Sequence, residues 1–381
     1  MKNRSLIIIT TSLFVSLHGY GQKSQLKIAQ NAVGKLQAAV VSKDKNKQMS
    51  VIGEGIKAAE SAQKDRKTKN WPETWAIKAY LSSYVALIDG NESNADRYYG
   101  MATEALDTAA KLDRFQNNTS LIDAANYNIM LIKQTKGSKA FQNNDFKNAF
   151  LNLKDVSDFF PKDTTLAINT ALSAQSMGDL DNTLAYFKRA KENGAKNPAL
   201  FQTMATIYTS KFENEQAINT LEEGLVLNPG HPILNNDYIN FLIDNEKYDK
   251  AMKAIDKSLT VDSKNKLLYF LYGYLYQLNG KNTTAELAYK KALAVDQNYF
   301  DALYQLGLVY IEFANTSLKD NNAENKVKSF SSYINRAEMS LLQANEINPN
   351  DKATVQLLTD IYTRKNKFDK VQELKRKLEE F

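Results

Sequence analysis

The sequence predicts an all-α fold in which antiparallel helix pairs stack side by side into an α-solenoid. Three observations support this prediction. Proline and glycine are sparse, with six and fifteen in 381 residues, which favours helices. The chain exceeds the roughly 250 to 300 residues at which single hydrophobic cores stop growing, yet 43% of it is hydrophobic. Small and apolar residues also recur every 34 residues, as in an array whose units pack against their neighbours.

The 34-residue spacing is clearest from the segment Pro198–His231 onward. Its eighth, twentieth and twenty-seventh positions are small and are occupied by Ala205, Ala217 and Gly224. Two further steps of 34 residues keep the register and reach first Ile239, Leu242, Ala251, Ile255 and Ser258, and then Gly273, Tyr276, Ala285, Tyr289 and Ala292. Steps in the other direction reach Gly178 in a unit from Thr164, and Gly137 and Ala149 in a unit from Met130. Such regularity indicates a repeat.

Within each unit the pattern predicts two helices. In the unit from Lys266, the large or small apolar positions four, seven, eight and eleven follow the spacing of one helical stripe; they are Tyr269, Tyr272, Gly273 and Tyr276. A second stripe consists of Ala285, Tyr289 and Ala292. Asn279 and Gly280 break the helix between the stripes. The small residues let the two helices approach closely, and the rings fill the wider gaps.

These units resemble the tetratricopeptide repeat (TPR) family, whose pattern has Gly or Ala at position eight, Tyr at eleven, Ala at twenty and twenty-seven, and Pro at thirty-two. The resemblance covers residues 130–381. It implies that residues 120–381 form a TPR array with units that start near residues 130, 164, 198, 232, 266, 300 and 352. The unit from residue 352 ends in a charged helix, residues 373–380, as a terminal cap requires.

Two regions depart from the pattern. In the unit from Phe300, the signals of the second helix, such as Ala337 and Leu341, come eighteen residues late. We expect the insertion to lengthen both helices by about nine residues each, so that they project about 13 Å; a disordered loop is the alternative. Residues 22–119 match loosely and are predicted to be degenerate helical repeats, with Trp75 on one helix and Ala102 on another.

The N-terminus predicts export. Lys2 and Arg4 precede an apolar run from Leu6 to Leu17, and Gly19 and Gly21 follow it, as in a secretory signal peptide over residues 1–21. The run is too short to span a membrane easily, so an uncleaved anchor is the alternative. The sequence contains no cysteine, which excludes disulfides and a lipid-modified cysteine. We therefore expect a periplasmic, envelope-associated or secreted bacterial protein without a transmembrane segment in its mature chain.

Candidates for catalytic, metal, cofactor or nucleic-acid sites are weak. Apart from His18 in the predicted signal peptide, the only histidine is His231, which lies in a turn and cannot form a zinc site alone. Gly53 and Gly55 fit a loose dinucleotide motif but precede a lysine-rich helix instead of a second strand. The basic stretch from Lys64 to Lys69 is interpreted as a solvated linker, with an anion-binding patch as the alternative. We expect no catalytic residue, metal, cofactor or nucleic acid.

The resemblance also implies a binding surface. In TPR proteins, positions two, five, nine, twelve and thirteen of the first helix line a concave groove. In the units from residues 198 to 300 these positions include no lysine or arginine, which argues against an acidic peptide tail as ligand. The candidate groove residues are Asn236, Asn240, Phe270, Tyr274 and Tyr304. The asparagines would bind an extended peptide backbone, and the rings would pack against its side chains.

The functional prediction is a non-enzymatic scaffold of the bacterial envelope that binds a protein or an extended peptide. Two alternatives remain open at this point. The chain could be a structural subunit of a permanent envelope or secretion assembly that docks through the long hairpin, or an enzyme with a carboxylate site in residues 22–119. The candidate groove has its own alternative, because the helix from Leu267 to Leu278 is apolar nearly all round and could be buried as core.

Overall fold

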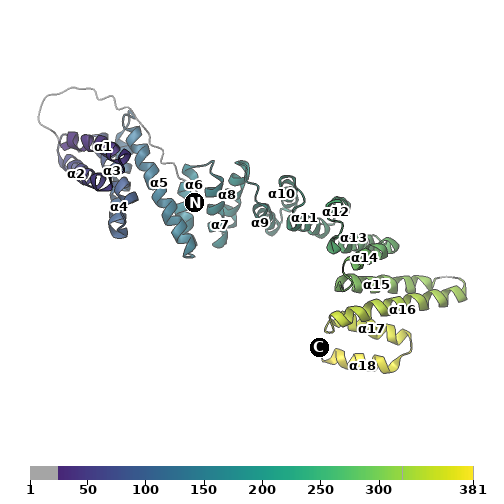
Figure 1. Cartoon of the computed structure of the whole chain (residues 1–381). Coiled ribbons are helices and arrows are strands. Elements are labelled where there is room, and N and C mark those ends of the chain that lie inside the picture. Colours follow the sequence, from purple (N-terminus) through teal and green to yellow (C-terminus); the bar gives the residue numbers. More distant parts are fainter. Residues whose placement is uncertain (1–24, 320, 381) are drawn as a thin grey trace. The chain divides into compact units, whose positions relative to one another are not determined.

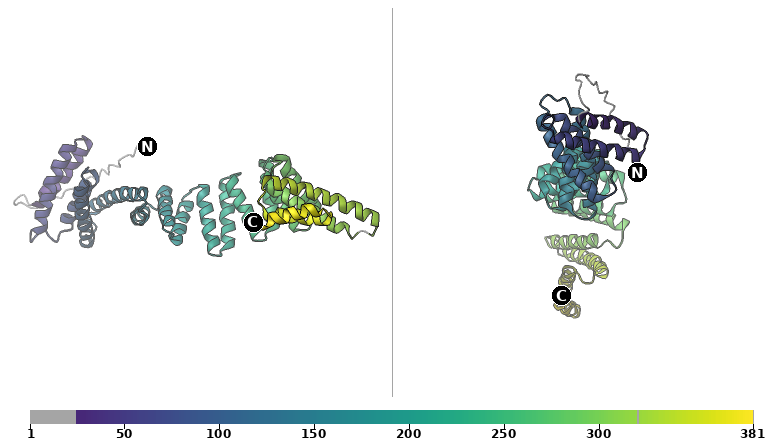
Figure 2. Two further views of the ribbon diagram at one scale, coloured as in Figure 1. Left: turned by 90° about the horizontal axis from the view of Figure 1, so that it is seen from below. Right: turned by 90° about the vertical axis from the view of Figure 1, so that its left-hand side faces the viewer.

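The computed structural model describes residues 25–319 and 321–380 and divides into two compact units. The first unit ends at Ala195, and the second begins at Lys196. Every regular element of the described residues is an α-helix, and consecutive helices form antiparallel pairs (Figures 1 and 2). This confirms the predicted all-α fold of stacked helix pairs. The predicted signal peptide, residues 1–21, lies outside the described residues.

From residue 25 onward, the first unit consists of four helix pairs. Its helices are α1 (Gln25–Val41), α2 (Lys45–Lys64), α3 (Pro72–Ile88), α4 (Glu92–Leu112), α5 (Thr119–Gln142), α6 (Phe146–Phe159), α7 (Thr164–Ser176) and α8 (Leu180–Glu192). The turn between α3 and α4 is held by Asn91, whose side chain accepts the backbone N–H of Asn94 at 3.0 Å. Ala102, Ala105 and Ala109 are fully buried along α4, so this helix lies close to its neighbours.

The glycine-rich motif of residues 53–55 lies inside helix α2 and not in a loop. A Cβ atom on Gly55 would lie 2.6 Å from the Cβ of Ala32 in α1 and 2.7 Å from a methyl group of Leu81 in α3. Such a distance is too short for two carbon atoms, so Gly55 lets three helices meet. Helix packing therefore explains Gly55, whereas a Cβ atom on Gly53 would meet no atom of a neighbouring helix within 4 Å.

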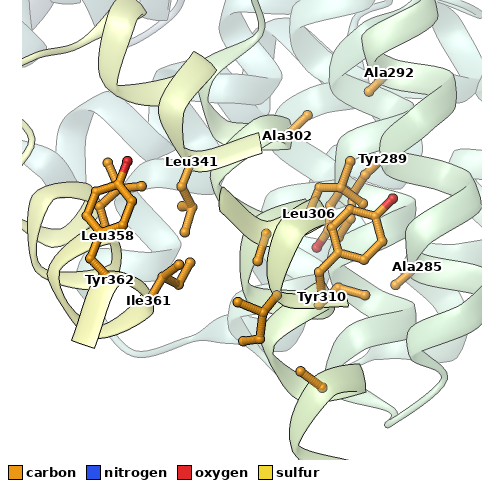
Figure 3. Packing of buried hydrophobic residues seen from close by; sticks show 14 of the residues in the cluster. Ala285, Tyr289, Ala292, Ala302, Leu306, Tyr310, Leu341, Leu358, Ile361 and Tyr362 are labelled. Carbon is orange, nitrogen blue, oxygen red and sulfur yellow. The ribbon is translucent and has the colours of Figure 1, made fainter. Parts of the chain in front are cut away.

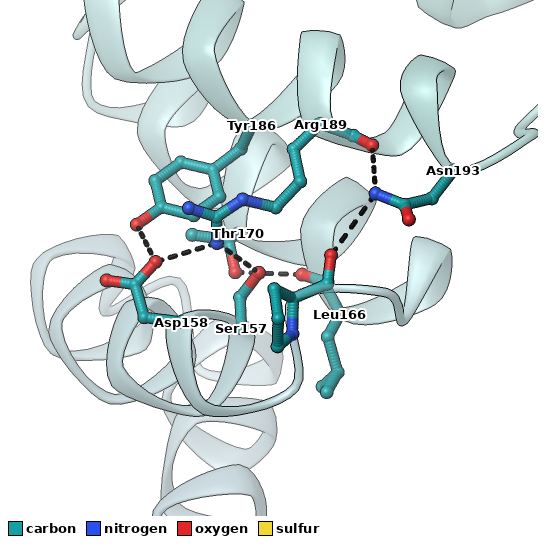
Figure 4. Close-up of polar contacts among 8 residues, drawn as sticks. Ser157, Asp158, Leu166, Thr170, Tyr186, Arg189 and Asn193 are labelled. Atoms are coloured by element: carbon teal, nitrogen blue, oxygen red, sulfur yellow. Dashed lines mark hydrogen bonds and ion pairs between the residues drawn. The ribbon is translucent and has the colours of Figure 1, made fainter.

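The end of the first unit carries a polar network that joins α6 to α8 (Figure 4). Arg189 donates to the carboxylate of Asp158 at 2.7 Å, and the hydroxyl of Tyr186 donates to the same oxygen at 3.0 Å. Asn193 donates to the backbone carbonyl of Pro161 at 3.2 Å.

Helix α5 begins at Thr119, whereas the repeat spacing places a unit start near Met130. Its early part is used in packing, since Ala125 is fully buried and Asn128 donates to Ser83 of α3.

The described residues of the second unit form five helix pairs. Its helices are α9 (Pro198–Ser210), α10 (Asn214–Leu227), α11 (Pro232–Asp244), α12 (Tyr248–Val261), α13 (Lys266–Leu278), α14 (Asn282–Val295), α15 (Phe300–Ser317), α16 (Ala323–Ile347), α17 (Lys352–Arg364) and α18 (Phe368–Glu379). Side-chain caps fix where α9, α11, α13 and α17 start, whereas α15 starts without one. His231 is one of these caps, because its Nδ1 atom accepts the backbone N–H of Leu234 at 3.3 Å.

The long pair α15 and α16 contains the predicted insertion (Figure 1). Helix α15 has 18 residues against 13 in α13, and α16 has 25 against 14 in α14. Both helices are longer, but the expected equal division is wrong, because α16 takes most of the insertion. The physical reason is local: the side chain of Asn322 accepts the backbone N–H of Asn325 and so starts α16 early.

The core of the long pair continues into the last pair (Figure 3). Tyr289, Leu306, Tyr310, Leu341, Leu358 and Tyr362 belong to one buried cluster. On α18, by contrast, Val371 is the sole buried residue, and the rest of the helix is largely polar. No described helix combines the length and the apolar character that crossing a membrane would require.

Candidate functional site

The predicted groove positions lie on one side of helices α9, α11, α13 and α15, here called the helix-A face. It comprises positions two, five, nine, twelve and thirteen of each helix, a spacing that keeps them on one helical stripe. None of these twenty residues is buried. The opposite stripe of α11 is buried through Leu234, Ile239 and Leu242, which turns the predicted positions of that helix away from the core. The helix-A face is therefore accessible within the second unit.

Asn236 and Asn240 lie one turn apart on α11. Asn240 is exposed and Asn236 is half-buried. In the described part of the chain, neither side-chain amide has a hydrogen-bond partner. Each amide can both donate and accept, which are the two functions that a peptide backbone requires. Position five of α9 differs, because Gln202 donates to the carboxylate of Asp237 on α11, a pairing that the repeat pattern alone did not indicate.

Phe270 and Tyr274 lie one turn apart on α13 and are half-buried. The ring of Phe270 lies 5.8 Å from that of Tyr289 and 5.5 Å from that of Tyr299, between their centroids. Part of this ring therefore holds α13 against α14 and the start of α15. Burial raises the pKa of Tyr289, with a further contribution from Tyr274, so the Tyr289 hydroxyl stays protonated and donates to Gln277 at 2.7 Å.

Tyr304 lies on α15 and is also half-buried. Its ring stacks on Phe300 with centroids 6.2 Å apart and packs against the same buried cluster as Phe270. Burial raises the pKa of Tyr304, and the carboxylate of Asp351 raises it further. The phenol therefore remains a neutral group at physiological pH.

The structure thus divides the five predicted residues into two sets. Phe270 and Tyr304 pack against one buried cluster, and Tyr274 lies close enough to Tyr289 of that cluster to influence its pKa. The two asparagines lie apart from these rings on α11. The alternative of a fully buried α13 does not hold, since Leu278 is 48% exposed, but the rings contribute to packing as well as to the surface.

Sequence reasoning missed a hollow of about 750 Å³ that is bordered by α10, α11, α12 and the start of α13. Asn236 is the single predicted groove residue on its wall. The signal that could have revealed it is Asn235, which stands at the fourth position of its repeat unit, where Phe201 and Tyr269 stand in the neighbouring repeat units.

The described residues also offer no cluster of metal ligands, since no group of three or more His, Asp or Glu side chains gathers within residues 25–319 and 321–380.

Two family models, both described as tetratricopeptide repeat, match residues 161–268 and 268–299. Among curated proteins, anaphase-promoting complex subunit 3 of Schizosaccharomyces pombe is 25% identical over 118 residues, which are 31% of this chain and 15% of that protein. This chain therefore matches a small part of that relative's length.

Solved structures to which the chain is similar include YrrB, described as a TPR protein with an unusual peptide-binding site. It is 17% identical, covers 54% of this chain and 96% of its own, and has a TM-score of 0.40. The C-terminal part of a TPR repeat-containing protein from Cytophaga hutchinsonii is 12% identical. It covers 64% of this chain and 92% of its own, with a TM-score of 0.48.

Proposed function

Because the chain belongs to the tetratricopeptide repeat family, we propose that it is a non-enzymatic scaffold of the bacterial envelope that binds a partner protein or an extended peptide. The fold itself suggests protein or peptide binding, since stacked repeats present long accessible surfaces. The proposed binding surface is the helix-A face, and its proposed ligand residues are Asn236, Asn240, Phe270, Tyr274 and Tyr304.

The observation that carries this proposal is the pair of unpaired amides on α11. Asn236 and Asn240 offer donors and acceptors on a face without a buried residue, and the half-buried rings of α13 and α15 offer apolar surface. Backbone capture by amides combined with apolar contacts is a common mode of peptide recognition. No lysine or arginine stands at the helix-A positions, so a neutral or basic peptide segment fits this face better than an acidic tail.

The envelope location is supported by the N-terminal sequence, in which a basic start and an apolar run precede Gly19 and Gly21. Mass spectrometry of the native protein tests it. Intact mature protein should begin at or within a few residues of Gln22, whereas a protein that retains Met1 would contradict export by cleavage.

The alternative function, a structural subunit of a permanent assembly, is favoured by one feature of the long pair. On α16, Val327 is 65% exposed and Met339 is 72% exposed, so the long hairpin offers apolar groups to a neighbour. The two functions differ in the isolated protein. A scaffold should be monomeric and folded when purified, whereas a permanent subunit should aggregate or need its partner.

The experiment for the scaffold combines cross-linking in intact cells with variants of the helix-A face. Partners captured by the native protein should be lost with Asn236→Ala and Asn240→Ala together. The matched control is Gln216→Ala with Asn219→Ala, which removes two exposed amides from α10. Asn240, Gln216 and Asn219 are exposed, and the half-buried Asn236 makes no side-chain hydrogen bond within the described residues. Exposed positions usually change stability by less than about 0.5 kcal/mol, and Asn236→Ala breaks no hydrogen bond of this kind, so both double variants should stay folded.

A second variant set tests the rings. Asn240→Ala, Tyr274→Ala and Tyr304→Ala together should also abolish capture, but the half-buried rings make some loss of stability unavoidable. If both the asparagine pair and this triple variant keep every partner of the native protein, the helix-A face is not the binding surface. If the triple variant unfolds while the asparagine pair changes nothing, the rings are core residues.

A further inference from the structure

The hollow bordered by α10, α11, α12 and the start of α13, here called the α10–α13 hollow, lies within the second unit. Its volume of about 750 Å³ falls in the range of sites that bind ligands. Part of its lining is apolar, through Leu225, Val226, Ala254, Val261 and Leu268. Val226 and Val261 are among the most exposed apolar residues of the chain, at 80% and 73%. The hollow therefore offers apolar surface that the described chain does not cover.

At this hollow, one repeat unit lacks a ring that both neighbouring repeat units have. At the fourth position, Phe201 is fully buried in the unit from Pro198, and Tyr269 stands in the unit from Lys266. Between them stands Asn235, whose amide donates to the hydroxyl of Ser258 at 2.7 Å. Ser258 in turn replaces the smaller residues of the neighbours, Gly224 and Ala292. A polar pair thus occupies the place of a ring against a small residue.

In the neighbouring repeat unit, the ring at the fourth position contacts a lysine. In the unit from Lys266, the ammonium group of Lys291 lies 5.6 Å from the ring centroid of Tyr269, within the range of a cation–π contact. Lys257 is the equivalent residue one unit earlier and lies on the wall of the hollow. Asn235 occupies the fourth position of the repeat unit from Pro232, as Tyr269 does in the next one. Lys257 therefore has no ring at this position of its own repeat unit to contact. Its position suits a ring that another molecule supplies.

The charges around the hollow favour an acidic ligand. Among the lining residues, Glu222 accepts the hydroxyl of Tyr238 at 2.6 Å and pairs with Lys250 at 3.6 Å, and Asp262 accepts the backbone N–H of Lys264 at 3.2 Å. Both carboxylates of the lining therefore already have partners within the chain. Lys253 and Lys257 also line the hollow, and within the described residues neither side-chain ammonium group has a hydrogen-bond or ion-pair partner.

We propose that the α10–α13 hollow binds an aromatic side chain from an acidic segment of a partner protein. The ring takes the place that Phe201 and Tyr269 fill in the neighbouring units. Lys257 covers this ring as Lys291 covers Tyr269, and together with Lys253 it pairs with carboxylates beside the ring. This site is separate from the helix-A face in its main contacts and in its charge preference, so either proposal can fail without the other.

The test is fluorescence anisotropy on the full chain with a fluorescein-labelled peptide that has phenylalanine between two pairs of acidic residues. A matched peptide carries alanine in place of the phenylalanine. The native protein should bind the phenylalanine peptide at least about tenfold more tightly, because that ring is the group buried in the hollow. Binding should weaken as salt is raised, since the flanking contacts are ionic.

Two variants locate the binding. Asn235→Tyr with Ser258→Ala gives this unit the Tyr269 and Ala292 pair of the next one, which fills the hollow. It should reduce binding of the phenylalanine peptide to the level of the alanine peptide without lowering the melting temperature. Lys253→Gln with Lys257→Gln changes exposed residues only, so it stays informative even if the first variant misfolds. It should weaken binding and flatten its salt dependence, unlike the control Lys328→Gln with Lys375→Gln.

Several results would overturn the proposal. One is equal binding of the two peptides, or no binding of either at millimolar concentration. Another is unchanged binding by both the filled variant and the Lys253 and Lys257 variant. Dodecanoate that binds tightly while the peptides do not would assign the hollow to a fatty acyl chain, and a dimer that the filled variant abolishes would assign it to a second copy of the chain.

Discussion

The helix pair α11–α12 and the pairs on either side of it follow one repeat pattern but pack differently. In the neighbouring pairs a ring at the fourth position lies against the second helix: a Cβ atom on Gly224 would lie 2.8 Å from Phe201. In α11–α12 that place holds the Asn235 and Ser258 hydrogen bond instead. Position eight differs as well, since Ile239 stands where Ala205 and Gly273 stand. Contact between α13 and α14 is accordingly more extensive than between α11 and α12.

The difference shows which positions a repeat needs and which it can change. Ala217, Ala251 and Ala285 stand at the twentieth position of consecutive units, and all three are fully buried. This small residue keeps the second helix close to the stack in these three pairs. The fourth position is less constrained, because α11–α12 folds into the same hairpin without a ring there. A repeat can therefore give up one ring and gain a hollow while its overall fold is kept.

Removing the ring from a neighbouring pair should have the largest effect. Phe201→Ala deletes a fully buried ring and should lower the free energy of unfolding by about 3–5 kcal/mol. The position-matched change Asn235→Ala removes one hydrogen bond and should cost about 0.5–1.5 kcal/mol. Urea unfolding followed by circular dichroism measures both. Equal costs at the two positions would show that the fourth position carries the same packing in both pairs.

Enlarging the small residue opposite that ring should have an intermediate effect. Gly224→Ser introduces the residue found at the same position in α12, and its Cβ would clash with the Cβ and Cγ atoms of Phe201. We expect a cost of about 1–3 kcal/mol from overpacking. Thermal unfolding of Gly224→Ser, Phe201→Asn and the double variant forms the test. The double variant recreates the polar pair of α11–α12, so its cost should be smaller than the sum of the single costs.

Much of the fold could be predicted from the sequence because single residues at fixed repeat positions indicate helix packing independently of their neighbours. A small residue at a fixed position of a helix, such as Ala285, indicates close approach whatever its neighbours are. The division of the insertion between α15 and α16 could not be predicted in this way. Helix-compatible residues flank the polar break on both sides, and the outcome depends on where a single cap, Asn322, starts α16.

The candidate site shows the same limit. The spacing rule placed all twenty helix-A residues at non-buried positions, although the ligand roles of Asn236, Asn240, Phe270, Tyr274 and Tyr304 stay a prediction. The half-burial of Phe270 depends on Tyr299, which lies outside any helix and outside the repeat stripes. The α10–α13 hollow lies beside Asn235, at a position where the neighbouring repeat units have a ring. Such a site becomes visible when neighbouring units are compared in three dimensions.

The smallest effect expected from this comparison concerns two equivalent lysines. Lys291 lies over the ring of Tyr269, whereas Lys257 stands beside the hollow that Asn235 leaves. Lys291→Gln should therefore cost about 0.5–1 kcal/mol through the lost cation–π contact at an exposed site. Lys257→Gln should stay within about 0.5 kcal/mol of the native protein, because it loses no ring contact. Replicate urea titrations on the full chain can resolve such a difference if both variants share one slope of unfolding free energy against urea concentration.

The comparison of the two lysines becomes sharper in the background of Asn235→Tyr with Ser258→Ala. The new ring should give Lys257 a partner, so that Lys257→Gln then costs as much as Lys291→Gln does. A cost that stays near zero in that background would mean that the introduced ring does not lie under Lys257, and that the two units differ in more than one side-chain pair.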